Sequence, residues 1–251
     1  MRKILFAVLT AVCYNIFREV CFLNDKIVIL IPAYNPTVDL ITLVKNLKEN
    51  LYSHIIIVND GSSLSCKSLF DAISSNCVVI NHEKNLGKGC ALKTGFKYIE
   101  RNYNNISTII TVDADGQHLI SDINKVKNLA ISKPNNFVLG CREFKKSKIP
   151  FRNRLGNALM SLIFHLVYKV NIPDTQTGLR AFPVSSVSKL LTIRGFRYEY
   201  EQNMLIYFVK NFRSNISCVN IAAVYKQKQV SYFKVFKDSV SIVKCLFLKS
   251  N

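Results

Sequence analysis

The segment KIVILIPAYNP, residues 26–36, decides the fold of this chain. After its first lysine it forms a continuous apolar run to residue 31, which is typical of a strand buried on both faces of a sheet. The prolines and the asparagine that follow predict a loop at the end of this strand. The same apolar texture returns at residues 54–58, 77–80, 108–112 and 137–139. The chain is therefore predicted to contain a series of short, buried strands.

Helical periodicity fills the intervals between these strands. Residues 38–50 place their leucine and valine side chains on one stripe, the pattern of a helix with one buried face. Residues 88–103 and 121–132 show the same pattern. Strands that alternate with helices predict βαβ units and a mostly parallel sheet, so the expected fold class is α/β. Ligands bind such sheets beyond the carboxyl ends of the strands.

The second half of the chain has a different texture. Residues 178–182 and 218–224 are predicted strands, and residues 198–210 a predicted helix. Residues 151–170 begin with basic side chains and then become mostly apolar, which suits either a lipid surface or the closure of the core.

Two appended segments flank the predicted domain of residues 26–229. Residues 1–25 contain an apolar stretch that is short for a bilayer span, and we interpret it as an interfacial anchor, an extra helix or an overlong start. Residues 230–251 predict a basic amphipathic helix, with phenylalanines and valines on one stripe and lysines off it. This helix suits a membrane interface, and an ordinary surface helix explains it equally well.

The chain carries a large excess of positive charge, with 34 Lys and Arg against 16 Asp and Glu and a net charge of +18. Such an excess favours polyanionic partners, which include an anionic membrane surface and phosphorylated substrates. Nucleic acid is not an expected partner, because the sequence has no recognition helix, zinc module or aromatic-rich binding signature. The eight cysteines include no C-x-x-C pair, which argues against a zinc site and a disulfide framework.

Polar loops follow the first two predicted strands and precede the helix that begins at residue 88. Tyr34 offers a flat face to a nucleobase. Asp60 can accept a hydrogen bond from a base N–H or a ribose hydroxyl, and Gly61 permits a sharp turn there. Lys88 stands between glycines at a helix start, where backbone N–H groups favour an anion. Taken alone, each segment also fits an ordinary turn or helix cap.

Two carboxylates, Asp113 and Asp115, follow the predicted strand at residues 108–112. Both can contact one hard cation if the strand bends there, and Gln117 can add a carbonyl oxygen. Phosphate and water oxygens would complete an octahedral site. The sequence therefore predicts a Mg²⁺ or Mn²⁺ site formed by Asp113, Asp115 and Gln117.

With these motifs in order, the chain resembles the inverting glycosyltransferases of family two, which have the GT-A fold, a Rossmann-like sheet flanked by helices. More narrowly it is similar to the polyprenyl-phosphate sugar synthases, the relatives of dolichyl-phosphate mannose synthase and undecaprenyl-phosphate glucosyltransferases, which also carry amphipathic interface helices. The segments that carry the resemblance are PAYNP, VNDGSS, NLGKGCALKTG, DADGQH, GCRE, PFRNRLGN, DTQTGLRAF, FRYEYEQNML and SYFKVFKDS. Cys141, where the family usually has Ser, and Tyr232, where it often has His, depart from the pattern.

The resemblance implies roles for individual residues. Asp115 and Gln117 bind the metal, together with Asp113, which also serves the ribose–diphosphate region. Asp174 faces the reaction centre, and the implied catalytic residues are Asp174, Asp115 and Arg142. Arg142, Arg152 and Arg154 face phosphate groups of the donor or the lipid, and Arg180 lies close by. The implied donor-site residues are Pro32, Ala33, Tyr34, Asn35, Asp60, Lys88, Asp113, Arg152, Arg154 and Arg180.

The expected activity is metal-dependent inverting transfer of a hexose from a UDP-glucose or GDP-mannose type donor to a polyprenyl phosphate, at the cytoplasmic face of a membrane by a peripheral or monotopic enzyme. The alternative acceptor is a sugar hydroxyl in cell-surface polysaccharide synthesis. Relatives of that kind commonly carry a Glu-Asp pair and a Trp, and this chain has neither. An ionised phosphate needs no general base, whereas a hydroxyl does. A catalytically inactive member of the fold is the remaining alternative.

Overall fold

The computed structural model describes residues 23–143 and 151–222, and only the backbone of residues 151–155. The predicted C-terminal helix at residues 230–251, and all but the last three residues of the extension at residues 1–25, lie outside this part of the chain. Among the helices that the structure describes, none combines the length and apolar character needed to cross a bilayer.

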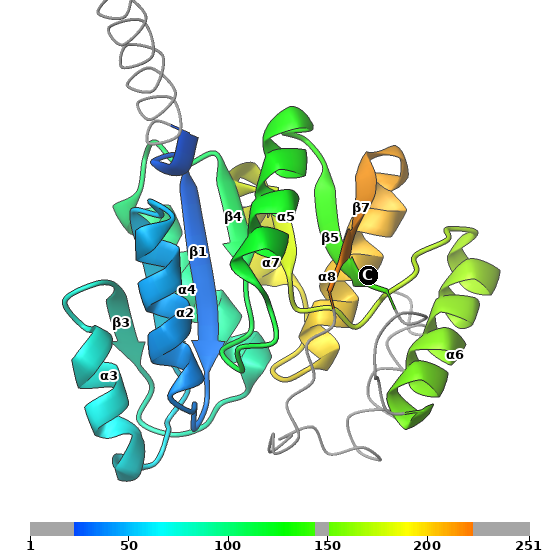
Figure 1. The fold of residues 1–251 in the computed structure, drawn as a ribbon. Coiled ribbons are helices and arrows are strands. Elements are labelled where there is room, and N and C mark those ends of the chain that lie inside the picture. Colours follow the sequence, from blue (N-terminus) through cyan, green and yellow to red (C-terminus); the bar gives the residue numbers. More distant parts are fainter. Residues whose placement is uncertain (1–22, 144–150, 223–251) are drawn as a thin grey trace, which may run out of the picture.

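A seven-stranded sheet forms the centre of the molecule (Figure 1). Its order is β3-β2-β1-β4-β6-β5-β7. The strands are β1 (Ile27–Ala33), β2 (His54–Asn59), β3 (Val78–Asn81), β4 (Thr108–Thr111), β5 (Phe137–Arg142), β6 (Arg180–Pro183) and β7 (Ile216–Ile221). β1 pairs in parallel with β2 and β4, and β2 with β3. β6 runs antiparallel to both β4 and β5, whereas β5 and β7 are parallel.

Helices cover both faces of the sheet, as Figure 1 shows. They are α2 (Asp39–Glu49), α3 (Lys67–Ile73), α4 (Lys88–Asn102), α5 (Ile120–Ser132), α6 (Phe151–Tyr168), α7 (Val187–Thr192) and α8 (Glu199–Asn211). One apolar layer packs α2, α3 and α5 against the sheet, and the other packs α4, α7 and α8. The prediction of a mostly parallel α/β sheet flanked by helices is confirmed, because each apolar run lies between two such layers.

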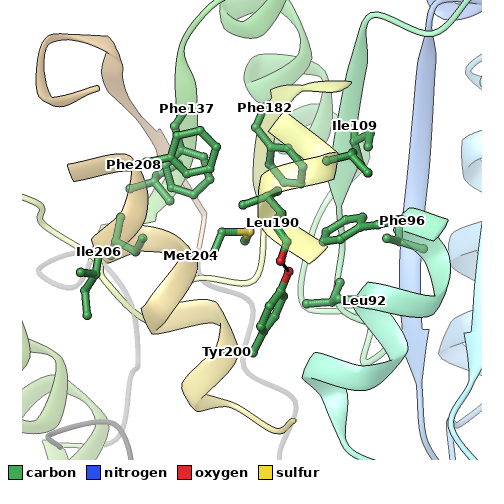
Figure 2. Close-up of a cluster of buried hydrophobic side chains, with 14 of the residues drawn as sticks. Leu92, Phe96, Ile109, Phe137, Phe182, Leu190, Tyr200, Met204, Ile206 and Phe208 are labelled. Atoms are coloured by element: carbon green, nitrogen blue, oxygen red, sulfur yellow. Dashed lines mark hydrogen bonds between the residues drawn. The ribbon is translucent and has the colours of Figure 1, made fainter. Parts of the chain in front are cut away.

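The layer on the α4 side is rich in aromatic rings (Figure 2). Phe137 from β5 stacks on Phe208 from α8, with 4.2 Å between ring centroids. Phe96 from α4 meets Phe182 from β6 edge-to-face at 5.7 Å. These pairs pack α4 against β6 and α8 against β5, which fixes both helices on the sheet. The first turns of α4 and α8 carry residues of the site described below.

Helix α6 has two apolar sides. Its inner side buries Met160 and Phe164 in the core. Its outer side carries Leu159, Leu162 and Leu166, which are 54%, 53% and 57% exposed. The spacing of these leucines, three and four residues apart, places them on one face of the helix. Residues 151–170 therefore both close the core and present an apolar surface.

Candidate functional site

The loops after β1 and β2 lie side by side because these parallel strands end in register, with Ala33 opposite Asn59. The Asn35 backbone N–H donates to Ser62 Oγ at 2.8 Å, and the Ser63 N–H donates to Asn35 Oδ1 at 2.8 Å. The predicted base-binding loop, from Pro32 to Asn35, is thus tied to the loop that carries Asp60.

Asp60 organises the turn that leads into α4. Its carboxylate is buried, and it accepts hydrogen bonds from the backbone N–H groups of Leu86 at 2.9 Å and Gly87 at 2.8 Å. His82 Nδ1 lies 2.8 Å from the same carboxylate, and His82 Nε2 lies 2.9 Å from Thr94 Oγ1. The structure therefore shows Asp60 in contact with the segment before Lys88. Contact with a base or ribose stays a prediction.

Lys88, the first residue of α4, binds two carboxylates from distant parts of the chain. Its Nζ lies 2.7 Å from Asp113 Oδ1 and 2.7 Å from Glu201 Oε2. Burial alone would lower the pKa of Lys88, but the charges of Asp113 and Glu201 outweigh it and raise the pKa above its ordinary value. Glu201 was missed as a site residue by sequence reasoning, since only the fold brings the first turn of α8 beside the end of β4.

Asp113 and Asp115 follow β4 and differ in their electrostatics. Burial acts to raise the pKa of Asp113, but Lys88 and His118 hold it well below its usual range. The pKa of Asp115 is raised, by burial first and by the charge of Asp113 second. The Gln117 backbone N–H donates to Asp115 Oδ1 at 3.0 Å. The pKa values of the two carboxyl groups are thus shifted in opposite directions.

The predicted metal residues fit a hard cation of the Mg²⁺ or Mn²⁺ type. A cation beside Asp115 would offset the burial and the charge of Asp113, which together raise the pKa of this carboxyl. In residues 23–143 and 151–222, no group of three or more His, Cys, Asp or Glu side chains is arranged to hold a metal ion. Such a cation would therefore take most of its ligands from substrate and water oxygens.

Arg142, at the end of β5, forms a two-point ion pair with Asp174. Arg142 Nε lies 2.6 Å from Asp174 Oδ2, and Arg142 Nη2 lies 3.0 Å from Oδ1. The Arg142 and Gln176 backbone N–H groups also donate to this carboxylate, each at 3.2 Å. Asp174 is fully buried. Two of the predicted catalytic residues are thus joined. The third, Asp115, follows β4, two residues after Asp113.

Arg180 lies in the interior rather than on a surface where a phosphate could bind. It is fully buried, and its guanidinium donates to the carbonyl oxygens of Thr177 at 2.8 Å and Glu201 at 2.6 Å. Its placement does not support a phosphate contact, and we leave it out of the donor site. Arg152 and Arg154 lie in the first turn of α6, where only the backbone is described. Their expected phosphate contacts stay predictions.

The chain has recognisable relatives. A family model described as glycosyl transferase family 2 matches residues 28–191. The chain is 33% identical over 225 residues to the UDP-N-acetylglucosamine–dolichyl-phosphate N-acetylglucosaminyltransferase of Methanococcus voltae, covering 81% of this chain and 88% of that protein. It is 26% identical to the dolichyl-phosphate beta-glucosyltransferase of Saccharomyces cerevisiae, covering 88% of this chain and 72% of that one.

Among solved structures, the glucosyl-3-phosphoglycerate synthase of Mycobacterium tuberculosis, in complex with Mn²⁺, UDP and phosphoglyceric acid, is similar in fold. The TM-score is 0.67 at 15% identity, and the match covers 88% of this chain and 77% of that chain. At this identity the match shows the shared fold alone.

Proposed function

Because the chain belongs to glycosyltransferase family 2, we propose that it transfers a hexose from a nucleotide diphosphate-sugar to a polyprenyl phosphate, with inversion at the anomeric carbon. Family membership makes the chain a glycosyltransferase, and the dolichyl-phosphate enzymes among its relatives support the choice of acceptor. The donor is of UDP-glucose or GDP-mannose type, and the name of the M. voltae relative adds UDP-N-acetylglucosamine to the donors that a test should include.

The observation that carries this proposal is the ion pair between Asp174 and Arg142. Asp174 is fully buried, and two guanidinium nitrogens hold its two oxygens. A carboxylate bound in this way is poorly placed to take a proton from a sugar hydroxyl. A phosphate monoester is ionised near neutral pH and requires no such base. Asp174 acts instead by orienting Arg142, whose planar group suits phosphate oxygens.

The donor site lies where β1, β2 and β4 end. Lys88 sits at the N-terminus of α4, where the helix favours an anion, and offers an ammonium to the diphosphate. Asp113 and Asp115, with Gln117, would hold Mg²⁺ or Mn²⁺, which when bound neutralises charge on the diphosphate leaving group. The cation and Lys88 therefore act on the same part of the donor.

An acceptor that is itself a lipid requires the enzyme to work at a bilayer. The half-exposed leucines on the outer side of α6 and the net charge of +18 both suit an anionic membrane surface. We include in the proposal that the enzyme associates with the cytoplasmic face of the membrane, in a peripheral or monotopic manner.

The test is an assay with the purified chain of 251 residues. Radiolabelled UDP-glucose, UDP-N-acetylglucosamine and GDP-mannose are offered with undecaprenyl phosphate, with dolichyl phosphate and with free sugars in separate reactions. The expected product is a labelled lipid that is cleaved by mild acid. Activity should vanish in EDTA and return with Mn²⁺ or Mg²⁺. Transfer only to a sugar hydroxyl would overturn the acceptor, and full activity in EDTA would overturn the metal.

A further inference from the structure

Glu201 forms an ion pair with Lys88 of the proposed donor site, and the proposed reaction does not yet explain this contact. Its side chain is 9% exposed, and Oε2 lies 2.7 Å from Lys88 Nζ. The same ammonium binds Asp113 Oδ1 at 2.7 Å. The Lys88 side chain is 18% exposed, and its ammonium is thus held by two carboxylates, one that follows β4 and one in the first turn of α8.

These two anchors are not equivalent once a donor and a divalent cation are bound. Asp113 is also a predicted ligand of the cation, and an ammonium and a divalent cation on one carboxylate repel each other. This repulsion weakens the contact between Lys88 and Asp113. The flexible four-carbon side chain of Lys88 can then adopt many other rotamers. Glu201 is not one of the predicted metal residues, so it can keep its contact with Lys88.

We propose that Glu201 is a positioning residue that holds the Lys88 ammonium in place for the donor diphosphate while Asp113 turns to the cation. This inference rests on the proposed nucleotide-sugar site. It assigns to Glu201 no contact with the reacting atoms, because its effect on the donor passes through Lys88.

The setting of Glu201 suits this role, since its backbone is fixed. Its carbonyl oxygen accepts a hydrogen bond from Arg180 Nη1 at 2.6 Å, and Arg180 Nε donates to Thr177 O at 2.8 Å. The neighbouring Gln202 Nε2 donates to Thr175 O at 2.8 Å. The first turn of α8 is therefore joined to the loop that carries Asp174. Because Arg180 binds both Thr177 and Glu201 from the interior, it fixes the first turn of α8 relative to the loop that carries Asp174.

A general base at position 201 is the competing role, and it predicts different kinetics. The loss of a base lowers kcat and leaves the binding of the nucleotide unchanged. The loss of a residue that positions Lys88 weakens the binding of the nucleotide diphosphate and raises the KM for the donor. Binding of the unreactive product nucleotide therefore separates the two roles without any acceptor.

The experiment compares Glu201→Gln, Glu201→Asp and Glu199→Gln with the wild-type chain. Glu199 lies on the same helix, and its Oε1 accepts from the Phe196 and Arg197 backbone N–H groups, a contact that a glutamine oxygen retains. Affinity for UDP and GDP is measured by calorimetry with and without Mn²⁺, next to KM and kcat. Glu201→Gln should weaken binding of whichever nucleotide the wild type binds by about tenfold, the effect of losing a charged hydrogen bond. Glu201→Asp should recover part of this loss, and Glu199→Gln should match the wild type.

A double-mutant cycle tests whether Glu201 acts through Lys88. In a Lys88→Met background, Glu201→Gln should cause no further loss of nucleotide affinity. Equal losses in both backgrounds would overturn the proposal, as would wild-type nucleotide affinity in Glu201→Gln or a fall in kcat alone. If the wild type binds neither UDP nor GDP, the proposed function fails, and the role of Glu201 fails with it. If the wild type binds a nucleotide and Glu201→Gln binds it with the same affinity, only the proposed role of Glu201 fails.

Discussion

Gly178 lies directly against the side chain of Asp113. A Cβ atom at position 178 would overlap both oxygens of the Asp113 carboxylate. The Gly178 carbonyl also accepts a hydrogen bond from Thr111 Oγ1 at 2.9 Å, which ties the loop before β6 to the end of β4. The absence of a side chain at position 178 therefore leaves the space in which the Asp113 carboxylate sits between Lys88 and the rest of the site.

Gly178→Ala is expected to displace the Asp113 carboxylate and lower kcat/KM for the donor by about 100-fold, the scale of a misplacement of about 1 Å. The fold should persist, because the overlapping atoms are the end of a side chain that can rotate away. Steady-state kinetics and the melting temperature measure the two effects. The matched control is Gly156→Ala, since a Cβ at that position in α6 has no neighbour within 4 Å. This control should keep full activity and gain about 0.5–1 kcal/mol of stability. Equal activities of the two variants would contradict the steric role of Gly178.

Asp115→Asn is expected to raise the melting temperature at pH 7 in EDTA. Burial and the charge of Asp113 raise the pKa of Asp115 in the folded state above its ordinary value in the unfolded state. Between these two pKa values, the folded state therefore binds more protons than the unfolded state. Stability then falls as pH rises through this interval, and the ionised carboxylate destabilises the folded protein at neutral pH. Asparagine removes that charge and retains an oxygen for the Gln117 backbone N–H. Scanning calorimetry should show the gain at pH 7 and a smaller one near pH 4. The exposed carboxylate Asp71, changed to Asn, serves as control, and a gain independent of pH would contradict the electrostatic cause.

Arg142→Met is expected to destabilise the protein by about 3–5 kcal/mol, because it leaves the buried Asp174 carboxylate without its charged partner. Urea unfolding measures the change. The double variant Arg142→Met with Asp174→Asn should recover most of the lost stability without recovering activity. If the double variant is as unstable as the single one, the loss arises from packing and not from an unpaired charge.

Leu162→Gln combined with Leu166→Gln is expected to lower the fraction of protein that sediments with anionic vesicles by several fold, because the outer face of α6 loses its apolar side chains. Added salt should weaken wild-type binding. Leu64 is 89% exposed and lies in a 3₁₀ turn between β2 and α3, away from α6. Leu64→Gln should sediment like the wild type. If the double variant sediments like the wild type, the outer face of α6 is not the membrane contact.

The sheet and its helices could be read from the sequence because their signals are local. A buried strand such as Ile27–Ala33 needs only a run of apolar residues, and a helix such as Asp39–Glu49 needs only a stripe. The same patterns predicted ligand binding beyond the carboxyl ends of the strands. The structure brings the side chains of Lys88 and Asp113 together there.

Only the tertiary structure decided which charged groups would be partners. The insertion of β6 between β4 and β5, antiparallel to both, brings the loop with Asp174 to Arg142 and the first turn of α8 to Lys88. It also places Arg180 in the interior, where backbone carbonyl oxygens accept its hydrogen bonds. Short apolar patterns specify which segments are buried, but the partner of a charge depends on strand order, and strand order is set by long-range packing that no local pattern records.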